Sequence, residues 1–168
     1  QSPARAILLV AAIMASANLL FGQEKQGAGS GYVIADTARA YQLLYKGDTL
    51  LISGNLRDAL SLFEEANRIY VALGIRDTLA ALSWEAVGMA RFYMGEKATT
   101  LHCYEMAIEI YQPIFGDKSL KIAKMYHNLG TICAGTTDFD RTIAFYEKSI
   151  EIKKGYAAPC LAQLSMTY

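Results

Sequence analysis

Apolar side chains recur three and four residues apart along most of the chain after residue 40. This spacing places them on one face of an α-helix, because a helix completes a turn about every 3.6 residues. Between the apolar stretches lie pairs of turn-forming and helix-capping residues, Gly54-Asn55, Gly95-Glu96 and Thr137-Asp138. The pattern therefore predicts helical hairpins. Their apolar faces are marked by Leu60, Phe63, Ile69 and Tyr70, then by Tyr104, Ile108 and Tyr111, and then by Ile143, Tyr146, Ile150 and Ile152.

The same residue types return at intervals of 41 and 42 residues, in four columns that stay in step. Small residues in these columns would let two helices approach closely, and the aromatic column would fill the remaining space. One hairpin cannot bury both of its apolar faces, so we expect neighbouring units to stack. The columns are Gly47, Gly88 and Gly130; Ala59, Thr100 and Thr142; Phe63, Tyr104 and Tyr146; and Ala66, Ala107 and Ser149.

Two of the units carry a motif at matching positions. Trp84-x2-Val87-Gly88 precedes Thr100-x3-Tyr104, and Tyr126-His127-Asn128-Leu129-Gly130 precedes Thr142-x3-Tyr146. On these residues the sequence resembles the tetratricopeptide repeat (TPR) family, whose pattern is W-x2-L-G-x2-Y followed by A-x3-F. A looser copy is Leu43-x2-Lys46-Gly47 with Ala59-x3-Phe63. The family's tyrosine, seven residues after the opening aromatic, is replaced by Leu50, Arg91 and Cys133.

The resemblance implies an all-α fold, a right-handed α-α superhelix of helical hairpins (a TPR solenoid). The array would cover residues 35–168, with units at about 40–80, 81–122 and 123–160 and a partial unit from 161. The period exceeds the usual length of about 34 residues, and the segments 114–117 and 139–152 are similar to the kinesin-light-chain variety. Residues 161–166 echo residues 79–84, so we expect a fourth unit and more protein beyond Tyr168.

The N-terminal segment differs from the repeats. Ala6 to Phe21 is uncharged and follows Arg5, which is typical of a signal peptide, and Ala15-Ser16-Ala17 or Gly22 would mark its cleavage site. We predict a signal peptide at 1–22, a flexible Gly-rich linker at 23–34, and an exported protein that is periplasmic, in the cell envelope or secreted. It would meet the membrane only transiently unless it is anchored downstream. The alternative is that this segment forms a buried first helix.

Charge and cysteine content argue against several classes of function. The 168 residues include 16 basic and 16 acidic side chains, so the formal net charge of zero argues against nucleic-acid binding. His102 and Cys103 would point about 100° apart on a helix, and Cys133 falls on a packing column. Three cysteines at unrelated repeat positions favour free thiols, and Glu64, Glu65 and Glu105 are expected to be solvated. We predict no enzyme, metal or cofactor.

The resemblance also places a binding groove on the first helices of the units. It would be largely apolar and would suit an amphipathic or extended hydrophobic segment better than a charged tail. Of the residues typical of a TPR carboxylate clamp, only Lys124 and Asn128 are present. The alternative is that Leu82, Met89 and Phe92 pack against neighbouring units or a capping helix. The groove columns are Tyr41, Leu44, Asp48 and Leu51; Leu82, Glu85, Met89 and Phe92; and Lys124, His127, Asn128 and Thr131.

The predicted function is a non-enzymatic scaffold that binds a peptide or partner segment in the concave groove of an exported TPR array. The alternative is that the chain is the N-terminal sensor or regulatory region of a larger effector. Arrays of this long-period kind resemble those joined to caspase-like peptidases, histidine kinases or DNA-binding output domains.

Overall fold

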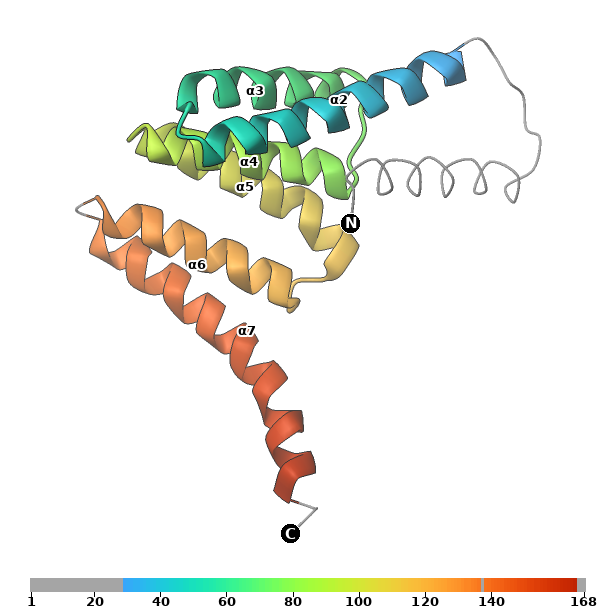
Figure 1. Ribbon diagram of the computed structural model, residues 1–168. Coiled ribbons are helices and arrows are strands. Elements are labelled where there is room, and N and C mark those ends of the chain that lie inside the picture. The colour runs from blue at the N-terminus through green and yellow to red at the C-terminus, as the bar shows by residue number, and fades with distance from the viewer. Residues whose placement is uncertain (1–28, 137, 166–168) are drawn as a thin grey trace. The chain divides into compact units, whose positions relative to one another are not determined.

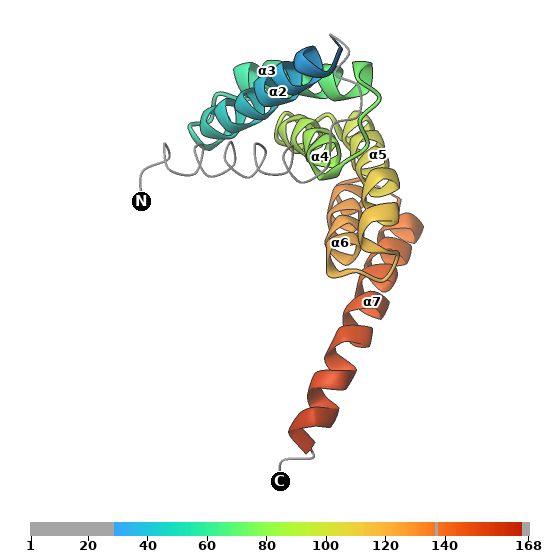
Figure 2. The ribbon, with the colours of Figure 1, turned by 90° about the vertical axis from the view of Figure 1, so that its right-hand side faces the viewer.

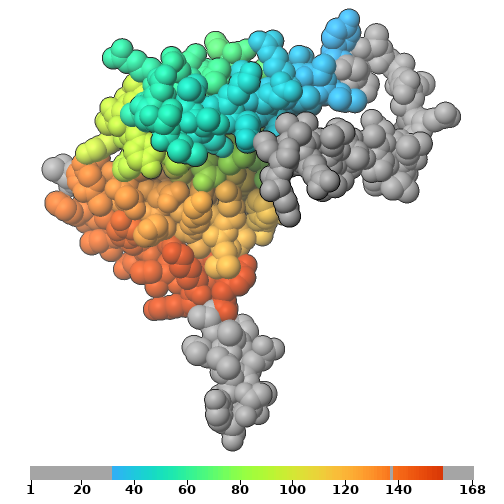
Figure 3. All heavy atoms as spheres, viewed as in Figure 1, coloured from blue at the N-terminus to red at the C-terminus, as the bar shows by residue number. Residues whose placement is uncertain are grey.

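The computed structural model describes residues 29–136 and 138–165, and every regular element in this part of the chain is an α-helix. From Ala35 onward the helices form one compact unit. They pair into three hairpins that follow one another in chain order (Figure 1). The space-filling view shows the same succession as colours that run from blue and green through yellow to red (Figure 3). The helices are α2 (Gly29–Ile52), α3 (Leu56–Ala72), α4 (Thr78–Tyr93), α5 (Lys97–Phe115), α6 (Leu120–Ala134) and α7 (Phe139–Ser165).

Glycines in the left-handed region of backbone space end several of the helices. Gly54 and Gly95 have φ angles of 83° and 82° and form the turns inside the first two hairpins, as the sequence predicts. Gly74 and Gly116, with φ angles of 65° and 79°, lie between consecutive units. A side chain at these positions would be strained, whereas glycine adopts the conformation freely.

Each unit after the first begins at a capped helix. The Asp77 carboxylate accepts a hydrogen bond from the Ala80 backbone N–H at 2.8 Å, and the Ser119 hydroxyl accepts one from Ile122 at 3.3 Å. No such residue follows Gly155 until Ser165. The chain therefore continues as one helix, and residues 161–165 belong to α7 instead of opening the separate fourth unit that we expected.

The repeated glycines lie directly against the repeated aromatic rings, as predicted. A Cβ atom added at Gly130 would lie 2.8 Å from Cδ1 of Tyr146, and one at Gly88 would lie 3.0 Å from Cδ2 of Tyr104. The first helix of each hairpin can thus approach the second only where it has no side chain. The three pairs are Gly47 with Phe63, Gly88 with Tyr104, and Gly130 with Tyr146.

Stacking between the units is visible at one repeat position, occupied by Asn67, Ile108 and Ile150. Asn67 is 8% exposed and donates a hydrogen bond to Ser83 of the next unit at 3.0 Å. Ile108 is 7% exposed, whereas Ile150 on the last described helix is 50% exposed. Because this position is buried only where another hairpin follows, the expected stacking is confirmed.

The predicted linker at 23–34 is partly wrong, because α2 already begins at Gly29. The segment from Tyr32 to Ile34 has no glycine or proline to interrupt a helix, and it belongs to α2. The predicted signal peptide and residues 23–28 lie outside the described residues. Within the described part of the chain, no helix is both long and apolar enough to cross a membrane.

Candidate functional site

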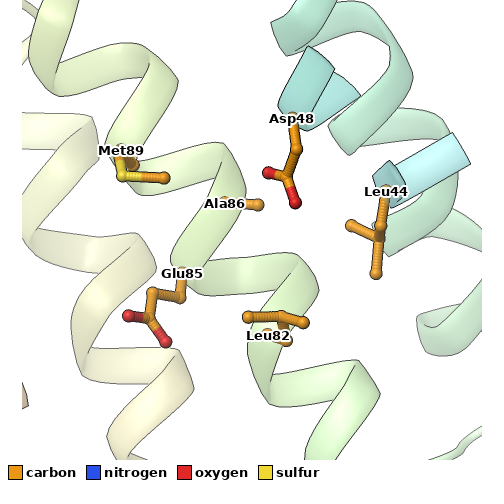
Figure 4. A pocket seen from close by; sticks show the side chains of 6 residues that line it. All are labelled: Leu44, Asp48, Leu82, Glu85, Ala86 and Met89. Atoms are coloured by element: carbon orange, nitrogen blue, oxygen red, sulfur yellow. The ribbon is translucent and has the colours of Figure 1, made fainter. Parts of the chain in front are cut away.

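A hollow of about 170 Å³ lies between the first helices of the first two units, α2 and α4 (Figure 4). We call it the α2–α4 pocket. Five of its six lining residues belong to the predicted groove columns. Sequence reasoning missed Ala86, which lies four residues after Leu82 and so shares its helix face. The lining residues are Leu44, Asp48, Leu82, Glu85, Ala86 and Met89.

Asp48 projects from α2 into the α2–α4 pocket (Figure 4). Partial burial raises the pKa of its carboxyl above the usual value, because the charged form loses hydration. Within the described residues it has no hydrogen-bonding or ion-pair partner. The pocket thus combines apolar walls with one unpaired carboxylate.

Glu85 supplies the second carboxylate of the pocket and, unlike Asp48, it is buried and paired. It is 8% exposed, and its Oε2 accepts hydrogen bonds from Lys121 Nζ at 2.8 Å and from the Tyr111 hydroxyl at 3.3 Å. Lys124 Nζ lies 3.8 Å from Oε1, and the Lys121 ammonium lies 4.4 Å from the centre of the Tyr111 ring. Glu85 therefore ties α4 to α5 and α6, and two lysines compensate its charge.

The groove residues of the third unit contact aromatic rings of the second helices. A hydrogen bond from the Asn128 side chain lowers the pKa of Tyr104, but burial dominates and raises it to about 12. The His127 ring centre lies 5.4 Å from that of Tyr146, and Thr131 Oγ1 lies 3.2 Å from the Tyr146 hydroxyl. The pocket does not include these residues.

The remaining groove residues divide between exposed and packed positions. Tyr41 is 41% exposed, while Leu51 and Phe92 are partly buried against the core. Leu82 is 37% exposed and lines the pocket beside Met89. The alternative of packing against neighbours thus describes Phe92, whereas Leu82 keeps a free surface.

The cysteine and histidine candidates are not brought together as nucleophile and base. Cys103 and Cys133 are free and buried, and burial raises the pKa of both thiols, which disfavours the reactive thiolate. The His102 ring packs edge-on against Trp84, with ring centres 6.0 Å apart. Among the described residues, no group of three or more side chains is arranged to hold a metal ion.

The glutamates of the second helices remain partly exposed to solvent, as expected, and they also form ion pairs. Arg91 binds Glu64 with an N–O distance of 2.6 Å, and Arg141 binds Glu105 at 3.4 Å. Glu64 and Glu105 share one repeat position. Cys133 occupies the Arg91 position in the third unit, so Arg141 from α7 supplies the cation there instead.

Comparison with known proteins supports this architecture. Residues 77–155, just under half of the chain, match the sequence profile of the tetratricopeptide repeat. No curated protein matches the sequence. Structural similarity extends over more of the chain than the profile does. The predicted fold class, an all-α superhelix of helical hairpins, is confirmed by the TPR-like solenoids that it resembles.

Three crystal structures illustrate the similarity. BtubC (BKLC) from P. vanneervenii has a TM-score of 0.67 at 20% identity; the match covers 69% of this chain and 46% of BtubC. MamA has a TM-score of 0.56 at 25% identity, with 76% and 66% covered. The TPR domain of Arabidopsis FLU has a TM-score of 0.54 at 16% identity, with 76% and 98% covered. The chain thus spans about half of BtubC and two thirds of MamA.

Proposed function

We propose that the chain is a protein-interaction scaffold that binds a segment of a partner protein along the first helices of its units. In the second and third hairpins, α4 and α6 lie on one side and α5 and α7 on the other (Figure 2). The observation that carries the proposal is the α2–α4 pocket, which opens between the first helices of two units. One side chain of the partner would enter it as an anchor.

The size of the pocket favours a side chain over a small molecule. Its volume of about 170 Å³ is below the range of about 300–1,000 Å³ that is typical of small-molecule sites. Leu44, Leu82 and Met89 supply apolar walls, and the flexible thioether of methionine adapts to different shapes. A single anchored residue of a peptide fits this space.

The test starts from a phage-displayed peptide library selected on the purified chain. Binding of the selected peptides is then measured for the wild type and for Leu82→Ala, which removes one wall of the pocket. The affinity should fall about tenfold, because burial of a leucine side chain contributes about 1.5–3 kcal/mol. The matched control is Ile143→Ala, since Ile143 is 55% exposed on α7 and lies outside the pocket.

The control variant should bind within about twofold of the wild type. A library that yields no binders would contradict the proposal, as would binders that respond equally to both substitutions. Circular dichroism of both variants shows whether a loss of binding reflects a loss of fold.

We propose further that the chain is exported and that its repeats are of the long-period kinesin-light-chain variety. The support for export is Arg5 followed by the uncharged run Ala6 to Phe21, and the support for the variety is the interval of 41 and 42 residues. The test of export is expression with the leader, followed by N-terminal sequencing of the product outside the cytoplasm. Cleavage would give a new terminus at Asn18 or Gln23, and retention of an uncleaved product in the cytoplasm would contradict export.

A further inference from the structure

The α2–α4 pocket combines apolar walls with the carboxylate of Asp48. We infer that the anchor residue of the partner is a lysine or an arginine, whose aliphatic stem lies against the apolar walls and whose cationic head binds Asp48. This inference rests on the proposed function and specifies the chemistry of the partner at the same site. Of the amphipathic and the extended hydrophobic segments that the groove columns suggested, it favours the amphipathic one.

The first step is the charge balance of the pocket. Of the two carboxylates that line it, Glu85 is bound by Lys121 and Lys124, whereas Asp48 has no partner among the described residues. The unpaired charge is therefore the carboxylate of Asp48 alone. Asp48 is exposed as a residue, but the pocket partly desolvates its carboxyl group and raises its pKa. A partly desolvated carboxylate gains more from an ion pair than a fully hydrated one does.

The second step is the position of Asp48 on its helix. Asp48 lies four residues before Ile52, the last residue of α2, and the last turn of α2 contains no basic residue. The C-terminal end of a helix carries a partial negative charge that acts mainly over its last turn, and Asp48 lies just before that turn. The helix end therefore adds a small attraction for a cation to that of the carboxylate.

The third step is the shape and lining of the pocket. Leu44 and Leu82 lie near the Asp48 carboxylate, as Figure 4 shows, and the space admits roughly one side chain. Lysine and arginine commonly pack their methylene stems on apolar surface while the charged head reaches a polar partner. A leucine or phenylalanine would fill the space but leave the carboxylate without a partner and further desolvated.

The experiment uses four synthetic nonapeptide libraries that differ only in the central residue, with the other positions degenerate and both ends blocked. The central residue is lysine, arginine, norleucine or glutamate. Norleucine keeps the unbranched stem of lysine but lacks the ammonium group, so it isolates the contribution of the charge. Retention of each library on the immobilised full chain is measured at low and at high salt.

For the wild type we expect the lysine and arginine libraries to be retained about tenfold more strongly than the norleucine library, and the glutamate library least. Asp48→Asn should abolish this preference while norleucine retention is kept. The matched control is Asp36→Asn, which removes the same charge from the same helix outside the pocket and should leave the order unchanged.

The outcomes separate the two proposals. Equal retention of lysine and norleucine libraries, or a preference for glutamate, would overturn the lysine anchor. If these libraries still respond to Leu82→Ala, the scaffold function stands with a different anchor. If no library is retained, or none responds to Leu82→Ala, the proposed function itself fails.

Discussion

The contact between Gly130 and Tyr146 makes a quantitative prediction about the hairpin fold. A Cβ atom at Gly130 would lie 2.8 Å from Cδ1 and Cε1 of the ring, well short of the 3.4 Å at which ordinary van der Waals contact begins. Gly130→Ala therefore forces the ring or the helix to move. Thr131 and His127 contact the same ring and oppose its displacement.

Two opposing terms set the size of the effect. Overpacking costs about 1–3 kcal/mol, while replacing glycine by alanine inside a helix gains about 0.5–1 kcal/mol. The net expectation for Gly130→Ala is a loss of about 1–2 kcal/mol in the free energy of unfolding. Urea denaturation followed by circular dichroism measures this loss as a lower midpoint at an unchanged slope.

Two further variants test the reasoning. Gly155→Ala changes a helical glycine of α7 whose new Cβ would meet no atom within 4 Å, so its stability should be unchanged or slightly higher. Combining Gly130→Ala with Tyr146→Leu removes most of the ring, so the alanine should cost nothing relative to Tyr146→Leu alone. The reasoning is refuted if Gly130→Ala is as stable as Gly155→Ala, or if its cost persists without the ring.

Two other predictions concern buried polar groups on α4 and α5. Glu85→Ala should lower the free energy of unfolding by about 1–3 kcal/mol, less than for a fully buried pair because the Lys121 side chain is 28% exposed. Glu65→Ala, which breaks the more exposed ion pair with Arg39, should cost under about 1 kcal/mol. If urea denaturation gives equal losses, Glu85 has no special structural role. Burial raises the pKa of Tyr104 from 10.0 to about 12, so the folded state retains this proton when the unfolded state has released it. Stability should therefore fall as the pH rises above about 10, with about 1 kcal/mol of the fall at pH 11 coming from Tyr104. Burial also raises the pKa of Tyr70 and Tyr111, so Tyr104→Phe should reduce this slope in urea titrations without abolishing it.

The sequence predicts the repeat architecture well because close packing ties residue type to position. Only glycine fits where Gly47 meets the Phe63 ring, so the column is visible as a repeated glycine opposite a repeated aromatic. The turn glycines are visible for a similar reason, since Gly54 and Gly95 adopt backbone angles that other residues rarely adopt. These constraints act within one unit and recur in the next, which makes them detectable without an alignment.

The boundaries are less predictable because they depend on weak, local preferences. Residues 29–34 contain two glycines and yet form the first turns of α2. At the other end, α7 continues to Ser165 although residues 161–166 repeat an earlier helix start. The repeated residues predict a helix at that point, but no capping residue separates it from the preceding helix.

The site could be predicted as a set of columns but not as a pocket. Glu85 and Asp48 were both assigned to the groove, and nothing in their spacing distinguishes them. The distinction arises from Lys121 and Lys124, which are 36 and 39 residues further along and reach Glu85 only after the third unit has stacked. A column assignment identifies which side chains can share a face, while the pairing of charges depends on the tertiary structure.

The pairing of charges also explains which part of the array remains free to bind a partner. The column that contains Leu44 in the first unit holds Glu85 in the second, and this one difference gives the two spacings between first helices different chemistry. Between α4 and α6, lysines bind Glu85 and bridge the helices. Between α2 and α4 no such bridge is present among the described residues, and Asp48 is left unpaired beside a hollow of about 170 Å³. Stacking and recognition therefore draw on the same repeat positions, and the residue at each position determines whether it stabilises the array or remains available to a partner.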